Sequence, residues 1–254
     1  MRITTWNVNG LRAALRKGFA EIIEQIAPDV LLLQEVRALP HQLPPEWACP
    51  DGWHVHWHPA EKLGYSGTAI WSRTPIEVLG TGLDGADPEG RVIRARIEGI
   101  EVLSVYLPSG SSSPARQQRK DVFLTEFEPW SMQLLKSKHP VVIGGDLNIA
   151  HTENDIFYAK ANEDQSGFLP HERKWMGRML ESGWSDFIRQ HYGEMQGPYS
   201  WWSNRGNARA LDRGWRIDHL LGNAPAAERF ASGDICRAGG MTVSDHAPVS
   251  IDLR

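Results

Sequence analysis

The stretch Val141-Val142-Ile143-Gly144-Gly145-Asp146-Leu147-Asn148 carries the strongest information on fold and chemistry in this chain. Its β-branched start predicts a buried strand, and the strand ends in an acid and an amide two positions apart. Side chains at i and i+2 of an extended segment point the same way, so Asp146 and Asn148 should face one side together. Such a pair can hold a water molecule, with the acid taking its proton. The alternative is an Asx-type turn, which we disfavour because buried residues directly precede the pair.

Short apolar runs with β-type residues recur on both sides of this segment, and helical stretches are few. Strands are predicted over residues 3–8, 30–33, 53–57, 68–71, 92–97, 102–107, 141–143, 217–221 and 249–253. Helices are predicted over residues 12–26, 114–135 and 170–181, the second with Val122, Phe123, Phe127 and Leu134 on its buried face. This excess of strands favours an α/β sandwich of two sheets flanked by helices over a strictly alternating parallel fold.

Length and composition set the class of protein. The 254 residues contain no linker or charge block, which predicts a single domain over residues 1–254. Two cysteines, no signal-peptide pattern and no long apolar stretch lead us to expect a cytoplasmic protein without a membrane partner. The net charge of -4 argues against coating nucleic acid by bulk electrostatics, so DNA binding would need a local basic face.

Two strand ends near the beginning of the chain carry polar side chains. Asn7 follows the first predicted strand, where it could instead cap an ordinary turn into a helix. Glu35 follows the apolar run at 31–33, a position that suits a metal ligand but also an acid that has already left the core. A buried acid or amide costs free energy unless something specific satisfies it, so both positions are candidates for a site.

Two predicted strands near the end of the chain carry polar side chains at or just before their first residues. Period-2 alternation places Asp218 on the opposite face from Trp215 and Ile217. The adjacent pair Asp245-His246 precedes the last predicted strand. An Asp that orients a His fixes its tautomer and stabilises its protonated form beside a phosphate, although an isolated Asp-His pair carries little meaning.

Taken together, these positions gather amides, carboxylates and one imidazole at strand ends and adjacent loops. Oxygen ligands from Asp and Glu select Mg²⁺ or Mn²⁺ and argue against zinc. A hard cation next to an acid that positions water implies hydrolysis of a phosphoester. The residues are Asn7, Glu35, Asp146, Asn148, Asp218, Asp245 and His246.

Six motifs occur in order along the whole chain: Trp6-Asn7-Val8-Asn9-Gly10, Leu33-Gln34-Glu35, Tyr106-Leu107-Pro108-Ser109-Gly110, Gly145-Asp146-Leu147-Asn148-Ile149-Ala150, Trp215-Arg216-Ile217-Asp218 and Ser244-Asp245-His246-Ala247-Pro248. Together they resemble the exonuclease III family of abasic-site endonucleases, within the endonuclease/exonuclease/phosphatase superfamily. Segments 64–67, 166–170 and 201–209 look like the DNA-repair branch rather than the lipid-phosphatase or sphingomyelinase branches. The resemblance implies a four-layered α/β sandwich, with two packed mixed sheets and the site at one end.

The resemblance also implies roles. Magnesium, with manganese as the alternative, would be held by Asn7, Glu35, Asp245, Asp146 and Asn148. Asp146, oriented by Asn148, would deprotonate the attacking water, while His246, braced by Asp218, would bind phosphoryl oxygens. Tyr106 would stabilise the transition state. The expected reaction is base-excision repair of double-stranded DNA, with a cut 5′ to an abasic site that leaves a 3′-hydroxyl.

Substrate contacts follow from the same resemblance. Trp201, Trp215 and Ile217 would wall a small apolar pocket for a flipped abasic sugar. Tyr65 and Arg91 match positions that touch DNA, and Arg205 would enter a groove as a wedge. A local basic face is expected from Arg205, Arg209, Arg213 and Arg216, whereas Trp202 could be an ordinary core aromatic.

Alternatives remain open at this point. The main activity could be 3′-5′ exonuclease or 3′-phosphatase action, and rivals from other classes are a non-catalytic DNA-binding protein and a lipid phosphodiesterase. Asn9 and Ser109 stand where some relatives have an acid and an amide, which leaves the number of metals open. A monomer is expected because one chain supplies the full set of site residues, and in a bacterium the protein would associate with the nucleoid.

Overall fold

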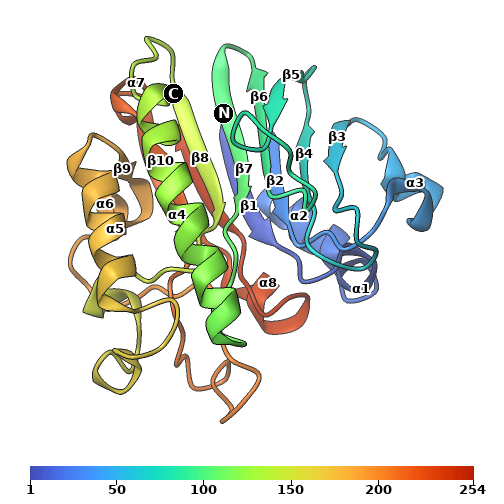
Figure 1. Cartoon of the computed structure of the whole chain (residues 1–254). Coiled ribbons are helices and arrows are strands. Elements are labelled where there is room, and N and C mark those ends of the chain that lie inside the picture. Colours follow the sequence, from blue (N-terminus) through green and yellow to red (C-terminus); the bar gives the residue numbers. More distant parts are fainter.

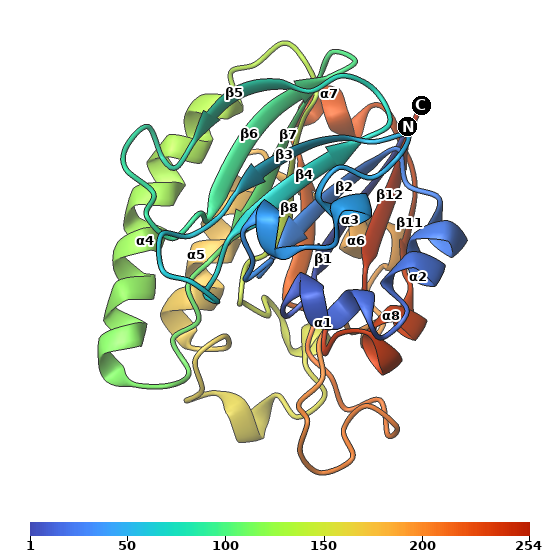
Figure 2. The ribbon, with the colours of Figure 1, turned by 90° about the vertical axis from the view of Figure 1, so that its right-hand side faces the viewer.

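The computed structural model describes all 254 residues and contains two six-stranded sheets packed face to face (Figures 1 and 2). The first sheet has the order β11 (Phe230–Ile235), β12 (Val249–Leu253), β1 (Arg2–Asn7), β2 (Val30–Gln34), β4 (Thr68–Ser72) and β3 (His54–His58). The second has the order β5 (Glu77–Thr81), β6 (Val92–Ile97), β7 (Ile100–Tyr106), β8 (Val141–Asp146), β10 (Asp218–Gly222) and β9 (Ser185–Asp186). Each sheet contains one parallel pair, β1 with β2 and β7 with β8, so both sheets are mixed.

Helices cover both outer faces of the sandwich. They are α1 (Leu11–Leu15), α2 (Phe19–Ile26), α3 (Pro45–Ala48), α4 (Pro114–Leu134), α5 (Pro170–Glu181), α6 (Phe187–Tyr192), α7 (Ala224–Ala227) and α8 (Arg237–Thr242). Figure 1 shows α4 and α5 against the second sheet and α1 and α2 against the first. The predicted four-layered sandwich of two mixed sheets is therefore confirmed. No helix in the structure has the length and apolar character needed to cross a membrane.

The main core lies between the two sheets. Ile3 and Leu32 from the first sheet pack in one cluster with Val102, Val142 and Leu220 from the second. Separate apolar clusters fill the outer layers under the helices. Because the central strands are buried on both faces, their sequences read as continuous apolar runs rather than as alternating ones.

The predicted strands all exist, but one predicted helix and one predicted helix face are wrong. The helix expected over residues 12–26 is two helices, because Gly18 adopts a φ of 99° and the backbone turns there. Val122, expected on the buried face of α4, is 52% exposed. That helix instead buries Lys120 together with Leu124 and Phe127.

Strand direction brings the polar residues at the strand ends to one end of the sandwich, which is called the site edge below. The parallel strands β1 and β2 end at this edge, and so does β8. The strand β12 runs antiparallel to β1, and β10 runs antiparallel to β8, so both begin where their neighbours end. Side chains from five strands therefore meet at this edge.

Candidate active site

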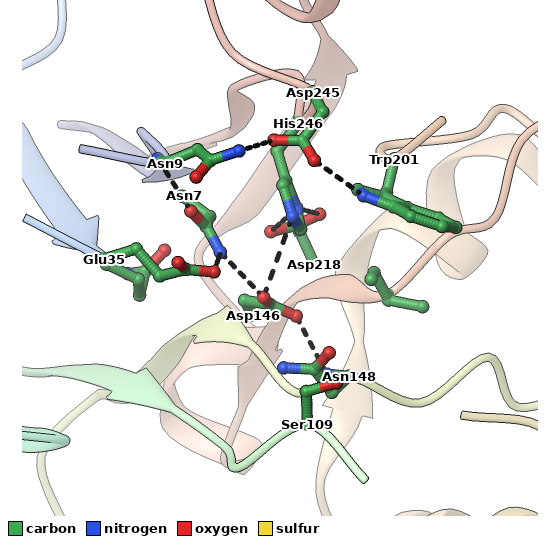
Figure 3. A network of polar contacts seen from close by, with 12 residues as sticks. Asn7, Asn9, Glu35, Ser109, Asp146, Asn148, Trp201, Asp218, Asp245 and His246 are labelled. Carbon is green, nitrogen blue, oxygen red and sulfur yellow. Dashed lines mark hydrogen bonds and ion pairs between the residues drawn. The ribbon is translucent and has the colours of Figure 1, made fainter. Parts of the chain in front are cut away.

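Five strand ends supply the polar cluster drawn in Figure 3. Asn7 and Asp146 are the last residues of β1 and β8, and Glu35 directly follows β2. Asp218 is the first residue of β10, and His246 lies just before β12. The positions singled out from the sequence therefore come together in space, although they lie far apart along the chain.

Asn7 links the two carboxylates of the cluster. Its Nδ2 donates hydrogen bonds to Glu35 Oε1 at 2.9 Å and to Asp146 Oδ2 at 2.8 Å. Its Oδ1 accepts from the backbone N–H of Asn9 at 3.0 Å within the turn, whereas helix α1 has Gly10 at its N-cap position and no side-chain cap. The other oxygen of Glu35 contacts the guanidinium of Arg37. Asn7 thus offers nitrogen rather than oxygen to the centre of the cluster, unlike the metal ligand that the sequence predicted.

The arrangement of Asp146 and Asn148 differs from the prediction. Asn148 has a φ of 51°, and its backbone N–H donates to Asp146 Oδ1 at 2.9 Å. Its side-chain Nδ2 donates to the carbonyl of Leu107 at 2.9 Å. The two residues form the Asx-type turn that the sequence analysis disfavoured, because the backbone must turn where β8 ends. The turn fixes one oxygen of Asp146 and leaves Oδ2 facing the cluster.

His246 is held by a carboxylate that is itself anchored. Nδ1 of His246 donates to Asp218 Oδ2 at 2.9 Å, and Ser200 Oγ donates to the same oxygen at 2.7 Å. Ser200 Oγ in turn accepts from the backbone N–H groups of Ile217 and Asp218 at 3.1 Å each. Sequence reasoning did not find Ser200, since a serine between two aromatic residues carries no motif of its own.

Electrostatics tune the protonation of both groups. Burial, together with the neighbouring carboxylates of Asp218 and Glu35, raises the pKa of Asp146 to about 7, and His246 opposes this shift. Burial alone would lower the pKa of His246, but the carboxylates of Asp218 and Asp146 raise it to about 10. Burial and the charge of Glu35 raise the pKa of Tyr106 well above its ordinary value, so its hydroxyl stays protonated.

The cluster fits a divalent cation. The carboxylate oxygens of Glu35 and Asp146 lie within 4.8 Å of each other and of a ring nitrogen of His246, and the two carboxylates are the groups that can hold an ion. The raised pKa of Asp146 indicates a buried place that favours added positive charge, and carboxylate oxygens are the ligands of hard cations. Asp245, a predicted ligand, lies outside this group, because its oxygens accept from Asn9 Nδ2 at 2.7 Å and Trp201 Nε1 at 3.2 Å.

An apolar wall borders the polar cluster. It consists of Trp201, Trp215, Ile217 and Phe168. The rings of Trp201 and Trp215 meet edge to face with centroids 6.0 Å apart, and the Trp201 ring lies 6.4 Å from that of His246. Ile217 belongs to this wall while Asp218 faces His246, as the predicted alternation requires.

The residues predicted to touch DNA differ in exposure. Arg205 is exposed in the loop at 203–213, and Tyr65 is half-buried. Arg91 is only 4% exposed, and it donates to the carbonyl of Tyr106 at 2.9 Å and to the hydroxyl of Tyr65 at 3.2 Å. In this conformation Arg91 therefore supports its neighbours instead of presenting a free surface.

Burial decides two expectations for residues between positions 201 and 216. Arg216, predicted on a basic face, is fully buried and pairs with Asp155 at 2.7 Å and Asp186 at 2.8 Å, so that prediction is wrong. Period-2 alternation alone could not separate a buried arginine from an exposed one. Trp202 is also fully buried, next to Tyr199, which confirms the core interpretation.

Comparison with known proteins gives the same family over nearly the whole chain. The model of the endonuclease/exonuclease/phosphatase family matches residues 4–246. An exodeoxyribonuclease of Bacillus subtilis is 37% identical over 99% of this chain and 98% of its own length. The DNA repair nuclease APEX1 of Danio rerio is 34% identical over 100% of this chain and 82% of its own length.

Solved structures agree. An AP endonuclease from Archaeoglobus fulgidus superposes with a TM-score of 0.89 at 27% identity, covering 100% of this chain and 99% of that one. A 3′-5′ exonuclease from Neisseria meningitidis gives a TM-score of 0.89 at 29% identity with the same coverage. The ordered motifs, the two-sheet fold and these matches lead to one conclusion: the chain belongs to the endonuclease/exonuclease/phosphatase family.

Proposed function

We propose that this protein is a Mg²⁺-dependent DNA-repair phosphodiesterase that cuts double-stranded DNA 5′ to abasic sites and leaves a 3′-hydroxyl, with residues 1–254 acting as one monomeric catalytic domain. The observation that carries the proposal is that the polar cluster of Asp146 and His246, which suits a phosphate, adjoins the apolar wall through Trp201. Relatives named as AP endonucleases support it. We place its action in the cytoplasm, associated with the nucleoid if the source is a bacterium.

The protonation states suit the hydrolysis of a phosphodiester. The carboxylate of Asp146, whose Oδ2 faces the cluster, can accept the proton of a water molecule. The imidazolium of His246, with a pKa of about 10, can donate from Nε2 to a phosphoryl oxygen. The hydroxyl of Tyr106 stays protonated and can donate to the oxyanion or the leaving oxygen.

Glu35 and Asp146 would hold the metal, with Asn7 orienting both carboxylates. When bound, a divalent cation neutralises phosphate charge and polarises the scissile bond. Asp245 and Asn148 would act indirectly, through hydrogen bonds to other site residues. Asp245 would orient Asn9, and the backbone N–H of Asn148 would orient Asp146. Magnesium is the proposed ion, and manganese would serve the same oxygen ligands.

The apolar wall would select the substrate. An abasic nucleotide swings out of the helix at a lower cost than a normal one, because it has no base to unstack. Its sugar would lie against Trp201, Trp215 and Ile217. Tyr65 and the exposed Arg205 would contact the DNA backbone or groove, and Arg91 would act through Tyr65 and Tyr106.

A second candidate function is 3′-5′ exonuclease or 3′-phosphatase action as the main activity. It is favoured by the names of two structures from Neisseria, a 3′-5′ exonuclease and a 3′ phosphatase bound to a DNA hairpin, which have TM-scores of 0.89 and 0.90. Both candidates use the same phosphodiester hydrolysis, and they differ in whether the bond cut lies at an internal abasic site or at the 3′ end of a strand.

One experiment separates them. A labelled duplex with a single tetrahydrofuran abasic analogue is incubated with the wild type and with Asp146→Asn, in Mg²⁺ or in EDTA. Metal-dependent incision 5′ to the analogue, reduced roughly 10²- to 10⁴-fold in the variant, supports the proposal. Stepwise loss from the 3′ end without incision would replace it with the second candidate.

A further inference from the structure

We propose that Lys120 and Glu172, a buried ion pair between α4 and α5, position the turn that carries Asn148 and thereby hold Asp146 in its reactive geometry. Both would be positioning residues, since neither would touch the substrate. The inference rests on the proposed role of Asp146 and adds two residues that no motif in the sequence indicated.

The pair is unusual in its degree of burial. Both side chains are completely buried, and Lys120 Nζ lies 2.5 Å from Glu172 Oε1. Lysine and glutamate are almost never fully buried unless they are paired. A buried ion pair is weak evidence for stability, because removing two charges from water costs about as much as their attraction returns. Stability alone therefore gives little reason for this pair to lie here.

The hydrogen bonds of the pair lead to the catalytic turn. Lys120 Nζ donates to the backbone carbonyl of Asn148 at 2.8 Å. Asn148 is in the left-handed region, which a residue other than glycine adopts only when its surroundings hold it there. The N–H of the same residue donates to Asp146 Oδ1 at 2.9 Å. Lys120 thus holds the carbonyl side of a residue whose N–H side orients Asp146.

Glu172 holds the segment next to that turn. Its Oε2 accepts from the backbone N–H groups of Gly167 at 2.7 Å and Leu169 at 3.1 Å. Gly167 has a φ of 98°, and a Cβ at this position would lie 3.1 Å from both the Asn148 carbonyl oxygen and the ring of Trp215. Only glycine fits this gap without displacing its neighbours.

The ion pair therefore connects two parts of the site. Through Asn148 it acts on the acid that takes the proton from water, and through Gly167 it acts on the segment that packs against Trp215 in the apolar wall. Losing the pair should loosen the turn and misplace Asp146, while the groups that bind the DNA backbone stay intact.

The test compares Lys120→Met with the double variant Lys120→Met, Glu172→Gln. The single variant removes the cation from a buried carboxylate, which keeps hydrogen bonds from Gln117 Nε2 and two backbone N–H groups, and it should lose stability. The double variant removes both charges and should regain most of that stability. We expect kcat for the abasic duplex to fall roughly 10- to 100-fold in both, with little change in KM. Recovery of kcat together with stability in the double variant would show a merely structural pair and overturn the inference.

A control away from the site is the partly exposed pair of Arg94 and Glu101, which lies at the opposite end of β7 with Nε and Oε1 2.5 Å apart. Arg94→Met should lower stability and leave kcat unchanged. Asp146→Asn is measured in parallel. Full activity in that variant would overturn both the proposed function and this inference, whereas its inactivity beside a fully active Lys120→Met would overturn the inference alone.

Discussion

Asp218 accepts a hydrogen bond from Nδ1 of His246 at 2.9 Å, and the opposite ring nitrogen, Nε2, lies 3.9 Å from Asp146 Oδ2. The imidazole is therefore placed between two carboxylates, one that holds it and one that faces the reaction. This arrangement raises the pKa of His246 to about 10 even though burial opposes the charge.

Replacing Asp218 by Asn should lower kcat roughly 10- to 100-fold, because the residue that orients and charges His246 is lost. The pKa of His246 should fall towards its ordinary value of about 6.5. The imidazolium would then disappear as the pH rises through neutrality, whereas in the wild type it persists to higher pH. Rates between about pH 6 and pH 9 should show the alkaline limb displaced to lower pH in the variant. An unmoved limb would contradict the role of this pair.

Metal binding should be visible without any assay of activity. An ion that binds only the native state raises the free energy of unfolding, by about 2.7 kcal/mol when its free concentration is a hundred times its Kd. The midpoint of thermal unfolding should therefore rise from EDTA to Mg²⁺ or Mn²⁺. Glu35→Gln should reduce this shift because it removes a charged oxygen ligand. Glu77→Gln, at an exposed position on β5, should keep the full shift, and an equal loss in both variants would argue against the site.

The apolar wall can be tested by selectivity. Trp215→Leu shortens the wall beside Trp201 and should reduce the preference for an abasic duplex over an undamaged one, measured as the ratio of the two kcat/KM values. The expected loss is about 10-fold or more, since a change in an apolar pocket is worth about 1–3 kcal/mol. Trp57→Leu is the matched control, because Trp57 packs against Trp71 on the outer face of the first sheet. A preserved ratio in Trp215→Leu would remove the wall from the proposal.

Arg216→Met should destabilise the fold by about 3–5 kcal/mol, because it leaves the buried Asp186 without its arginine and the buried Asp155 with Arg189 alone. Chemical unfolding of the wild type and the variant at neutral pH measures this difference. A loss below about 1 kcal/mol would show that the network is relaxed or hydrated in solution.

The same network predicts a dependence on acid. Burial alone would raise the pKa of Asp155 and Asp186, but the charge of Arg216 holds both well below the ordinary range. A carboxyl with a lowered pKa in the native state stabilises the fold above its unfolded pKa of about 3.9 and loses that contribution as the pH falls below it. Losing Arg216 raises the pKa of both carboxyls in the folded variant, so these take up protons at a higher pH than in the wild type. The free-energy difference between wild type and Arg216→Met should therefore shrink on acidification, beginning above about pH 4. A constant difference would contradict these pKa directions.

How well the sequence predicted each element depended on burial. The central strands were found because burial on both faces leaves continuous apolar runs, as at 30–33 and 141–143. The strands β5, β9 and β11 were not predicted, and all three lie at sheet edges. An edge strand such as β5 is largely exposed and can carry polar residues and glycine, so its sequence gives little signal.

The sequence by itself determined the two-sheet class and the chemical groups of the site, because those follow from residue types that core and chemistry both require. Tertiary structure alone decided how those groups are used: Asn7 presents nitrogen to the cluster, Asp146 is fixed by a turn, and Arg216 is buried. It alone revealed Ser200, Lys120 and Glu172, whose roles depend on partners that are distant in sequence. Local patterns encode periodicity and composition, whereas burial and hydrogen-bond partners depend on contacts that exist only after the sheets have packed.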